Sequence, residues 1–230
     1  MLAAMTILSL YERFSFSILP CSLGVARDAI LAQSAAWGKP LAVDRATVRD
    51  VRPIFDSPDG PAHPPAVRKA ILLSEVVGPE GVKTLFVSSV ADGYSSMVYT
   101  ISGNLPGLHL SVQISRLSIE YPRNALTAIK SQEAVRVVYS MKDASSWEFF
   151  EKGRILPFEQ IDFYKARRKR DRLTPEIIDR YISKLGYGTL DEVFWTSNEA
   201  AHLICDASFR LAEGCKPDMG SSEGNIKAAP

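Results

Sequence analysis

The chain has 230 residues, of which 46% are hydrophobic and 23% are charged, as in an ordinary folded globular protein. This composition excludes wholesale disorder. Lys and Arg number 27 against 26 Asp and Glu, so the net charge of +1 excludes a surface field of one sign that would attract nucleic acid or a membrane. Three cysteines and three histidines are too few for a disulfide scaffold or a multi-metal protein.

The first ten residues are almost all apolar, but their flanks do not match a membrane anchor or an export signal. Glu12 and Arg13 end the apolar run, whereas a spanning helix needs about 20 residues. No Lys or Arg precedes the run, as a signal peptide would require. The odd cysteine count fits a reducing compartment. We therefore expect a cytoplasmic protein with no membrane association.

Residues 1–65 predict a strand, a helix and a long loop. Apolar residues alternate with serines over Phe14 to Ile18, which is typical of a half-buried strand. Leu23 to Ala36 has helical spacing and is followed by Gly38. Six prolines between residues 37 and 65 then predict a loop, whose packing against the rest of the chain stays open. A short helix is predicted over Val67 to Ser74.

The centre of the chain has the period of β-strands. Val82–Val90 and Tyr94–Ser102 predict two strands joined by a tight turn, and residues 108–115 alternate strictly between apolar and polar. The alternation changes phase after Ser115, so a bulge or a second strand is expected there. Residues 135–141 predict a hairpin with residues 147–149. These segments predict an antiparallel sheet of about five strands over residues 82–151.

The last third has helical spacing. One helix is predicted from Phe158 to Arg172 and a second from Pro175 to Leu185, with Thr174 as its N-cap and Gly186 as its end. A short turn at residue 189 and a third helix over residues 200–211 follow. The predicted fold class is α+β, with an antiparallel sheet of about five strands covered by C-terminal helices and an N-terminal strand–helix unit. The expected divisions are residues 1–65, a main domain over 66–213 and a disordered tail over 214–230.

The first candidate site is a basic run, in which residues 165–172 carry six positive charges against Asp171 alone. Such a run is typical either of a solvated helix end or of a surface that binds an acidic partner. It follows an aromatic-rich stretch in which Phe149 and Phe150 must point to opposite faces of a strand. Aromatic and arginine side chains are enriched at protein interfaces, so the predicted partner-binding residues are Arg167, Arg168, Arg170, Arg172, Phe150 and Tyr164.

Two other groups of residues are candidate sites, one for catalysis and one for a metal ion. His109 shares a predicted strand face with Ser111, and a serine, a histidine and an acidic group from Asp92, Asp143 or Glu148 would suit a hydrolase or transferase. The same pattern is typical of the solvent face of an antiparallel sheet. His202 and Cys205 lie one helical turn apart with Cys215 beyond, but three ligands without a Cys-x-x-Cys pair do not make a zinc site.

The leading hypothesis is therefore a non-catalytic module that binds another protein, without cofactor or metal. The sequence contains neither a phosphate-binding Gly-x-x-x-x-Gly-Lys-[Ser/Thr] loop nor a Gly-x-Gly-x-x-Gly fingerprint, which argues against common nucleotide enzymes. Two alternatives stay open, which are a small enzyme that uses His109 and a weak nucleic-acid binder that uses residues 165–172.

Overall fold

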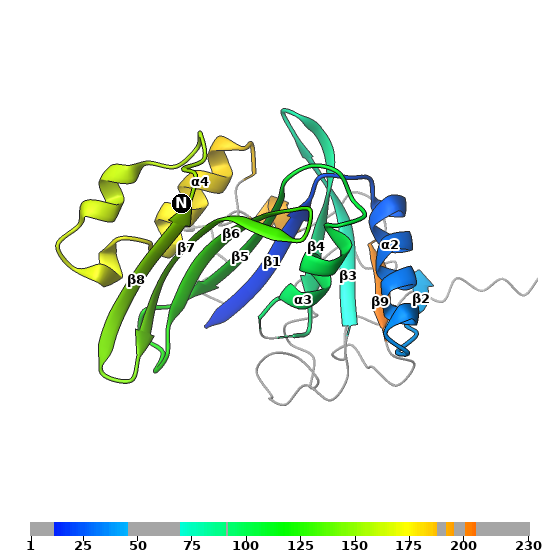
Figure 1. The fold of residues 1–230 in the computed structure, drawn as a ribbon, viewed down its shortest axis with the longest axis horizontal. Helices are drawn as coiled ribbons and strands as arrows, with labels where there is room; N and C mark the ends of the chain where they lie inside the picture. The colour runs from blue at the N-terminus through cyan, green and yellow to red at the C-terminus, as the bar shows by residue number, and fades with distance from the viewer. Residues whose placement is uncertain (1–11, 46–69, 91, 188–191, 196–200, 206–230) are drawn as a thin grey trace, which may run out of the picture.

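A computed structural model describes residues 12–45, 70–90, 92–187, 192–195 and 201–205, and the fold is α+β (Figure 1). Its strands are β1 Arg13–Leu19, β2 Ala42–Arg45, β3 Ala70–Gly78, β4 Gly81–Ser88, β5 His109–Ser115, β6 Arg123–Lys130, β7 Glu133–Asp143, β8 Ser146–Gly153 and β9 His202–Cys205. Its helices are α2 Leu23–Ala36, α3 Ser95–Ile101, α4 Pro175–Lys184 and α5 Glu192–Trp195, with 3-10 turns η2 Ile161–Lys165 and η3 Lys169–Asp171.

The described strands form one sheet in the order β2-β9-β3-β4-β1-β5-β6-β7-β8, and every neighbouring pair is antiparallel. The α+β class and the antiparallel sheet are thus confirmed. The expected number of about five strands is wrong, because the described residues alone form nine. The helices are not confined to the C-terminal third either, since α2 and α3 precede most of the sheet in sequence.

The sheet has a hydrophobic core on each face. On one face, Phe16, Val112 and Leu126 pack with residues of α4 and with Trp195 of α5. On the other face, Leu19, Phe86 and Ile129 pack with residues of α2 and α3. In Figure 1, α4 and the turns before it lie at the β6–β8 end of the sheet, and α2 lies toward β3, β9 and β2. Two covered faces mean that several central strands are buried on both sides.

The N-terminal strand is the middle of this sheet. β1 lies between β4 and β5, where Phe16 is opposite both Val87 and Val112. It is apolar on one face, with Phe14, Phe16 and Ile18 all buried. The described part of the N-terminal unit therefore packs on the main sheet, which the sequence left open. Most of the proline-rich loop lies outside the described residues, except that residues 42–45 of it form β2.

Three predicted elements have the wrong type. The helix expected over residues 67–74 is strand β3, because Ile71, Leu72 and Leu73 are all buried and a strand covered on both faces shows no alternation. The strand expected over residues 94–102 is helix α3. Asp92 precedes this helix and accepts hydrogen bonds from the Tyr94 backbone N–H and from Ser95 Oγ. Within the helix expected over residues 200–211, residues 202–205 form β9, which lies between β2 and β3.

Other predicted elements are confirmed. α4 has Thr174 as its N-cap, with its side chain accepting from the Ile177 backbone N–H, and Pro175 in its first turn. The β7–β8 hairpin, β1, β4, β5 and α2 lie close to their predicted positions. The expectation of a bulge or a second strand directly after Ser115 is wrong, because β5 ends there, residues 116–122 form no strand, and β6 begins only at Arg123. The predicted tail over residues 214–230 lies outside the described residues.

None of the helices in the described part of the chain is long and apolar enough to cross a membrane.

Candidate interaction surface

The basic run does not form the expected helix. Instead it forms the two short turns η2 and η3, because the backbone is extended at Ala166 and Arg168 and interrupts helical hydrogen bonding there. An α-helix would spread the charged side chains around its circumference. With two separate turns, Arg172 points inward while its neighbours point outward. The predicted helix was therefore wrong about which side chains share a surface.

Specific contacts hold this segment on the sheet. Ser140 Oγ of β7 donates a 2.9 Å hydrogen bond to the Lys169 backbone carbonyl. Arg172 Nε donates a 2.9 Å hydrogen bond to the Ala166 carbonyl, and its guanidinium lies 5.3 Å from the centre of the Phe149 ring on β8. Arg172 therefore has a structural role, because it contacts both a ring on β8 and the backbone of the segment to which it belongs. The contacts fix the position of the exposed residues between them.

Five basic side chains of this segment are exposed, and we call them the basic surface: Lys165, Arg167, Arg168, Lys169 and Arg170. The side chains of Arg168 and Arg170 are 65% and 45% exposed, and both approach the carboxylate of Asp171. Lys165 pairs with Asp162 at 2.8 Å. Exposed pairs of this kind are worth little in water, so their cations stay available to another anion.

A buried charged network joins β7 and β8 to the residues that precede the basic surface, and the sequence did not reveal it. Arg136 of β7 is 1% exposed and donates to Glu159, to Glu151 of β8 and to the Gly153 carbonyl. Glu159 also accepts from Tyr164 Oη at 2.7 Å and from the Leu156 backbone N–H at 2.8 Å. The available sequence signal is Arg136 itself, a charged residue between apolar residues of a predicted strand, which needs a partner if it is buried.

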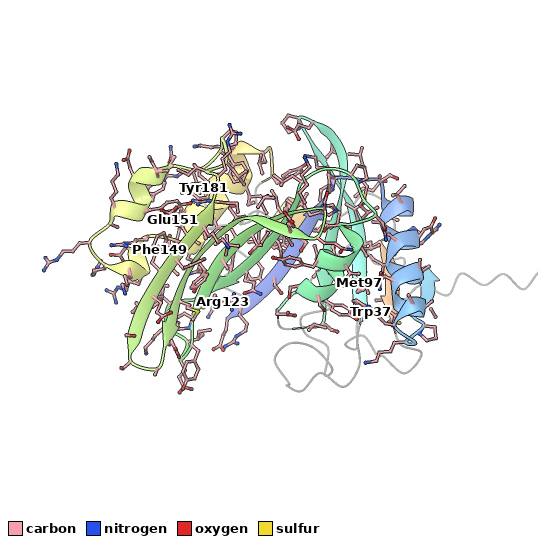
Figure 2. All side chains as sticks on the ribbon, in the orientation of Figure 1. Trp37, Met97, Arg123, Phe149, Glu151 and Tyr181 are labelled. Atoms are coloured by element: carbon pink, nitrogen blue, oxygen red, sulfur yellow. The ribbon has the colours of Figure 1, made fainter. Side chains whose placement is uncertain are left out.

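The network raises two pKa values. Burial alone would lower the pKa of Arg136, but its hydrogen bonds and charge interactions with Glu159 and Glu151 outweigh burial and raise it. Burial raises the pKa of Tyr164, and hydrogen bonds to Tyr181 and Glu159 raise it further. Both shifts favour the charged form of Arg136 and the neutral form of Tyr164. The network links β7, β8 and the residues leading into η2. Figure 2 shows Glu151, Phe149 and Tyr181 together at this end of the molecule.

The six predicted partner-binding residues do not share one surface. Arg167, Arg168 and Arg170 belong to the basic surface, whereas Arg172 is used in packing. Tyr164 is 6% exposed and bound to Glu159, so it is not available to a partner. Phe150 is 42% exposed, but it lies on the opposite face of β8 from Phe149 and stacks on Tyr139 with ring centres 5.2 Å apart. The structure thus separates Phe150 from the arginines.

His109 is in the protein interior. It is fully buried on β5, and Ser111, Ser115 and Ser17 on the same sheet face are buried as well. Residues 94–102, which were expected to form a neighbouring strand, contain helix α3 instead, so their hydroxyl groups at Ser96 and Thr100 lie on a helix. Burial lowers the pKa of His109, and backbone hydrogen bonds near Ile129 and Gly107 oppose this shift. A neutral, buried imidazole has no access to a substrate in this structure, and this geometry does not favour the enzyme hypothesis.

The positions of His202 and Cys205 also do not support a metal site. These residues lie at the two ends of β9, and residues three apart on a strand point to opposite faces. Cys215 lies outside the described residues. Within the ranges that the structure describes, no group of three or more His, Cys, Asp or Glu side chains could hold a metal ion.

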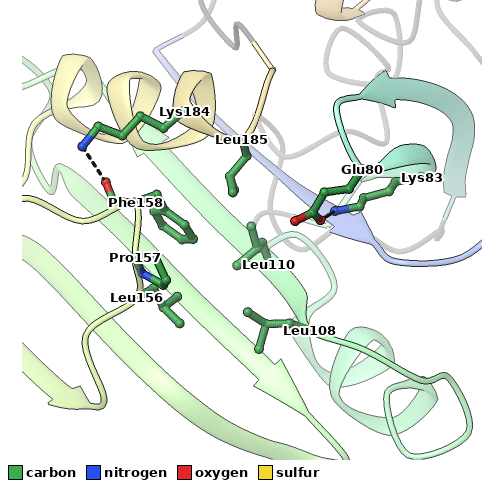
Figure 3. A pocket seen from close by; sticks show the side chains of 9 residues that line it. All are labelled: Glu80, Lys83, Leu108, Leu110, Leu156, Pro157, Phe158, Lys184 and Leu185. Atoms are coloured by element: carbon green, nitrogen blue, oxygen red, sulfur yellow. Dashed lines mark hydrogen bonds and ion pairs between the residues drawn. The ribbon is translucent and has the colours of Figure 1, made fainter.

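A groove of about 450 Å³ lies beside α4 (Figure 3). Its wall is mainly apolar and is formed by Leu108, Leu110, Leu156, Pro157, Phe158 and Leu185, with Glu80, Lys83 and Lys184 at its margins. Lys83 pairs with Glu80 at 2.6 Å, whereas Lys184 donates a 3.1 Å hydrogen bond to the Phe158 carbonyl. Its volume lies within the range of small-molecule sites, and the ammonium groups of Lys83 and Lys184 are at its margins.

Comparisons of this chain with protein-family models, with curated proteins and with solved structures find no match.

Proposed function

We propose that this protein is a non-catalytic binding module that recognises an acidic surface of another protein through its basic surface. The observation that carries the proposal is the fixed, outward position of Arg167, Arg168 and Arg170 on a backbone that Ser140 and Arg172 hold against the sheet. A segment that is already ordered loses little conformational entropy when it binds, so its cations form ion pairs at a low cost. The local excess of positive charge also steers an acidic partner toward this surface.

The surroundings of the basic surface favour a protein over nucleic acid. Exposed apolar side chains lie in the same part of the chain, with Ile155 47% and Ile161 44% exposed, and mixed apolar and arginine surfaces are typical of protein interfaces. The aromatic rings nearby are covered by cations, since Arg172 lies over Phe149 and Arg180 lies over Phe163. These rings are therefore not free to stack on the bases of a single strand.

The test compares two probes at several salt concentrations by fluorescence anisotropy. One is a labelled peptide of alternating Glu and Leu residues, and the other is a single-stranded oligonucleotide of equal charge. We expect the peptide to bind more tightly than the oligonucleotide. The triple variant Arg167→Ser, Arg168→Ser, Arg170→Ser should weaken peptide binding at least tenfold, because it removes three exposed cations and leaves the packing residue Arg172 in place.

The control variant carries the same charge change elsewhere. Arg27→Ser, Lys39→Ser and Lys130→Ser alter exposed or partly exposed residues outside the basic surface, so peptide binding should change less than threefold. Equal effects of the two triple variants would show attraction by net charge alone and would overturn the proposal. Tighter binding of the oligonucleotide than of the peptide would favour the nucleic-acid alternative instead.

A second candidate function is binding of a small amphipathic acid in the groove beside α4. It is favoured by one observation, which is that the Lys184 ammonium at the margin of an apolar wall has a carbonyl rather than a carboxylate as its partner. A carboxylate with an alkyl chain would satisfy both features. Calorimetry with decanoate and with decanol tests this function, because decanoate should bind and decanol should bind at least tenfold more weakly. Equal binding of the two, or decanoate binding unchanged by Lys184→Ala, would contradict it.

A further inference from the structure

Strand β8 is an open edge of the sheet. Of the strands that the structure describes, it pairs only with β7, so the N–H and C=O groups along its other side are not part of any described ladder. It is eight residues long, contains no proline, and most of its residues are exposed. An edge of this length and composition is a template for pairing with another strand.

The pairing of β8 with β7 defines which of its side chains share a face. Glu148, Phe150 and Lys152 lie opposite Met141, Tyr139 and Val137. These three β7 residues are only partly buried, whereas Val138 and Ser140 on the other face are fully buried. Glu148, Phe150 and Lys152 therefore form one row on the more open face of the sheet, with a carboxylate, a ring and an ammonium in order.

This row is complementary to a copy of itself. When two identical strands pair antiparallel about a two-fold axis, the axis is perpendicular to the sheet and one residue faces its own copy. With Phe150 at the axis, each Glu148 faces Lys152 of the other copy, and the two Phe150 rings face each other. Opposite charges and aromatic pairs that face each other across strands stabilise a sheet.

Other registers of the same symmetry lack this match. An axis at Glu148, Glu151 or Lys152 puts identical charges directly opposite each other, which destabilises a sheet. An axis at Phe149 puts Glu148 opposite Phe150 and forms no ion pair. Only the register centred on Phe150 pairs Glu148 with Lys152 without facing like charges.

We propose that two copies of this chain associate through β8 in the antiparallel register centred on Phe150, so that one sheet runs through both copies. The strand that pairs with the open edge is thus β8 of a second copy, and charge complementarity determines the register. The axis is perpendicular to the sheet, so both basic surfaces lie on the same side of the dimer. The inference does not depend on what the basic surface binds.

Charge reversal tests both the edge and the register, with the dissociation constant measured by sedimentation equilibrium. Wild-type protein should dimerise. Glu148→Lys and Lys152→Glu should each raise the dissociation constant at least tenfold, because each places like charges opposite each other twice. An equimolar mixture of the two variants should form a heterodimer within threefold of wild-type affinity, since both pairs are then opposite in charge. The Glu148→Lys, Lys152→Glu double variant should recover the homodimer for the same reason.

The control variants are Lys130→Glu and Glu133→Lys. These exposed residues face each other across the β6–β7 pair, away from the β8 edge, so reversing either charge should leave dimerisation within threefold of wild type. A wild-type chain that stays monomeric at about 200 μM, where a dimer with a dissociation constant of about 1 μM would be almost completely formed, would overturn the proposal. So would single variants that dimerise like wild type, or a mixture that associates no better than each variant alone. Circular dichroism of every variant establishes that the fold is unchanged.

Discussion

Arg136 of β7 and Glu159, which follows β8, form a buried ion pair whose nitrogen and oxygen lie 2.7 Å apart, with side chains 2% and 0% exposed. Glu159 also accepts hydrogen bonds from Tyr164 and from the Leu156 backbone. The ion pair thus attaches to the sheet the segment that precedes the basic surface. Its importance for stability can be measured by removing each partner.

Glu159→Gln should lower the free energy of unfolding by about 3 kcal/mol, because it leaves the buried Arg136 charge poorly compensated. Glu151→Gln is the matched control, since Glu151 binds the same guanidinium but is 42% exposed, and it should cost about 1 kcal/mol or less. Replacing both partners, with Arg136→Met and Glu159→Leu, should recover part of the loss because no charge is left buried. Urea unfolding monitored by circular dichroism measures all three variants. Equal costs for the two Gln variants would show that burial does not govern this network.

The buried His109 predicts a pH dependence of stability. Its pKa is lowered in the folded protein, so the unfolded chain takes up the proton first as pH falls below its ordinary value of about 6.5. The stability contributed by the neutral imidazole is complete above that pH and is lost as pH falls toward the lowered pKa. His109→Gln keeps a neutral polar side chain and should remove this component. The check is the wild-type minus variant free energy of unfolding between pH 7.5 and 5, which should decrease on acidification, and a constant difference would refute it.

Two glycines should respond to alanine in opposite directions. Gly186 follows α4 with φ of +88°, and a Cβ there would lie 2.2 Å from Cδ of Pro79, so Gly186→Ala should cost at least about 1 kcal/mol. Gly24 lies within α2 with open space around its Cβ position, so Gly24→Ala should stabilise by about 0.5 kcal/mol. Thermal unfolding of the two variants provides the comparison. A loss of stability for Gly24→Ala would show that α2 needs the glycine for another reason.

Phe149 and Phe150 are adjacent but should differ in their contribution to stability. The Phe149 ring is partly buried, with ring centres 5.3 Å from Tyr164, and it supports the Arg172 guanidinium. Phe149→Ala should therefore cost about 3 kcal/mol. Phe150→Ala removes an exposed ring that stacks on Tyr139 and should cost about 1 kcal/mol. Chemical unfolding at low micromolar protein concentration gives both values, and a larger loss for Phe150 would contradict the assignment of the two faces.

Local sequence signals predicted the elements that depend on neighbouring residues. Thr174, Pro175 and Gly186 indicated α4 because capping and backbone restriction act within one or two turns. The alternation of residues 108–115 indicated β5 because one period describes the whole strand. The same signals located the basic run and the opposite orientations of Phe149 and Phe150. They did not show whether the polar face of β5 meets solvent or helix α3, since that depends on residues distant in sequence.

The sequence by itself determined the α+β class, the β7–β8 hairpin, α4 and the position of the positive charge. Only the tertiary structure decided that residues 70–78 and 202–205 are strands, because pairing between distant segments outweighs the local apolar pattern when both faces are covered. It also decided that Arg172 and Tyr164 are packing residues and that Arg136 meets Glu159. Burial and charge pairing are properties of side chains brought together by the fold, and the linear order of residues does not contain them.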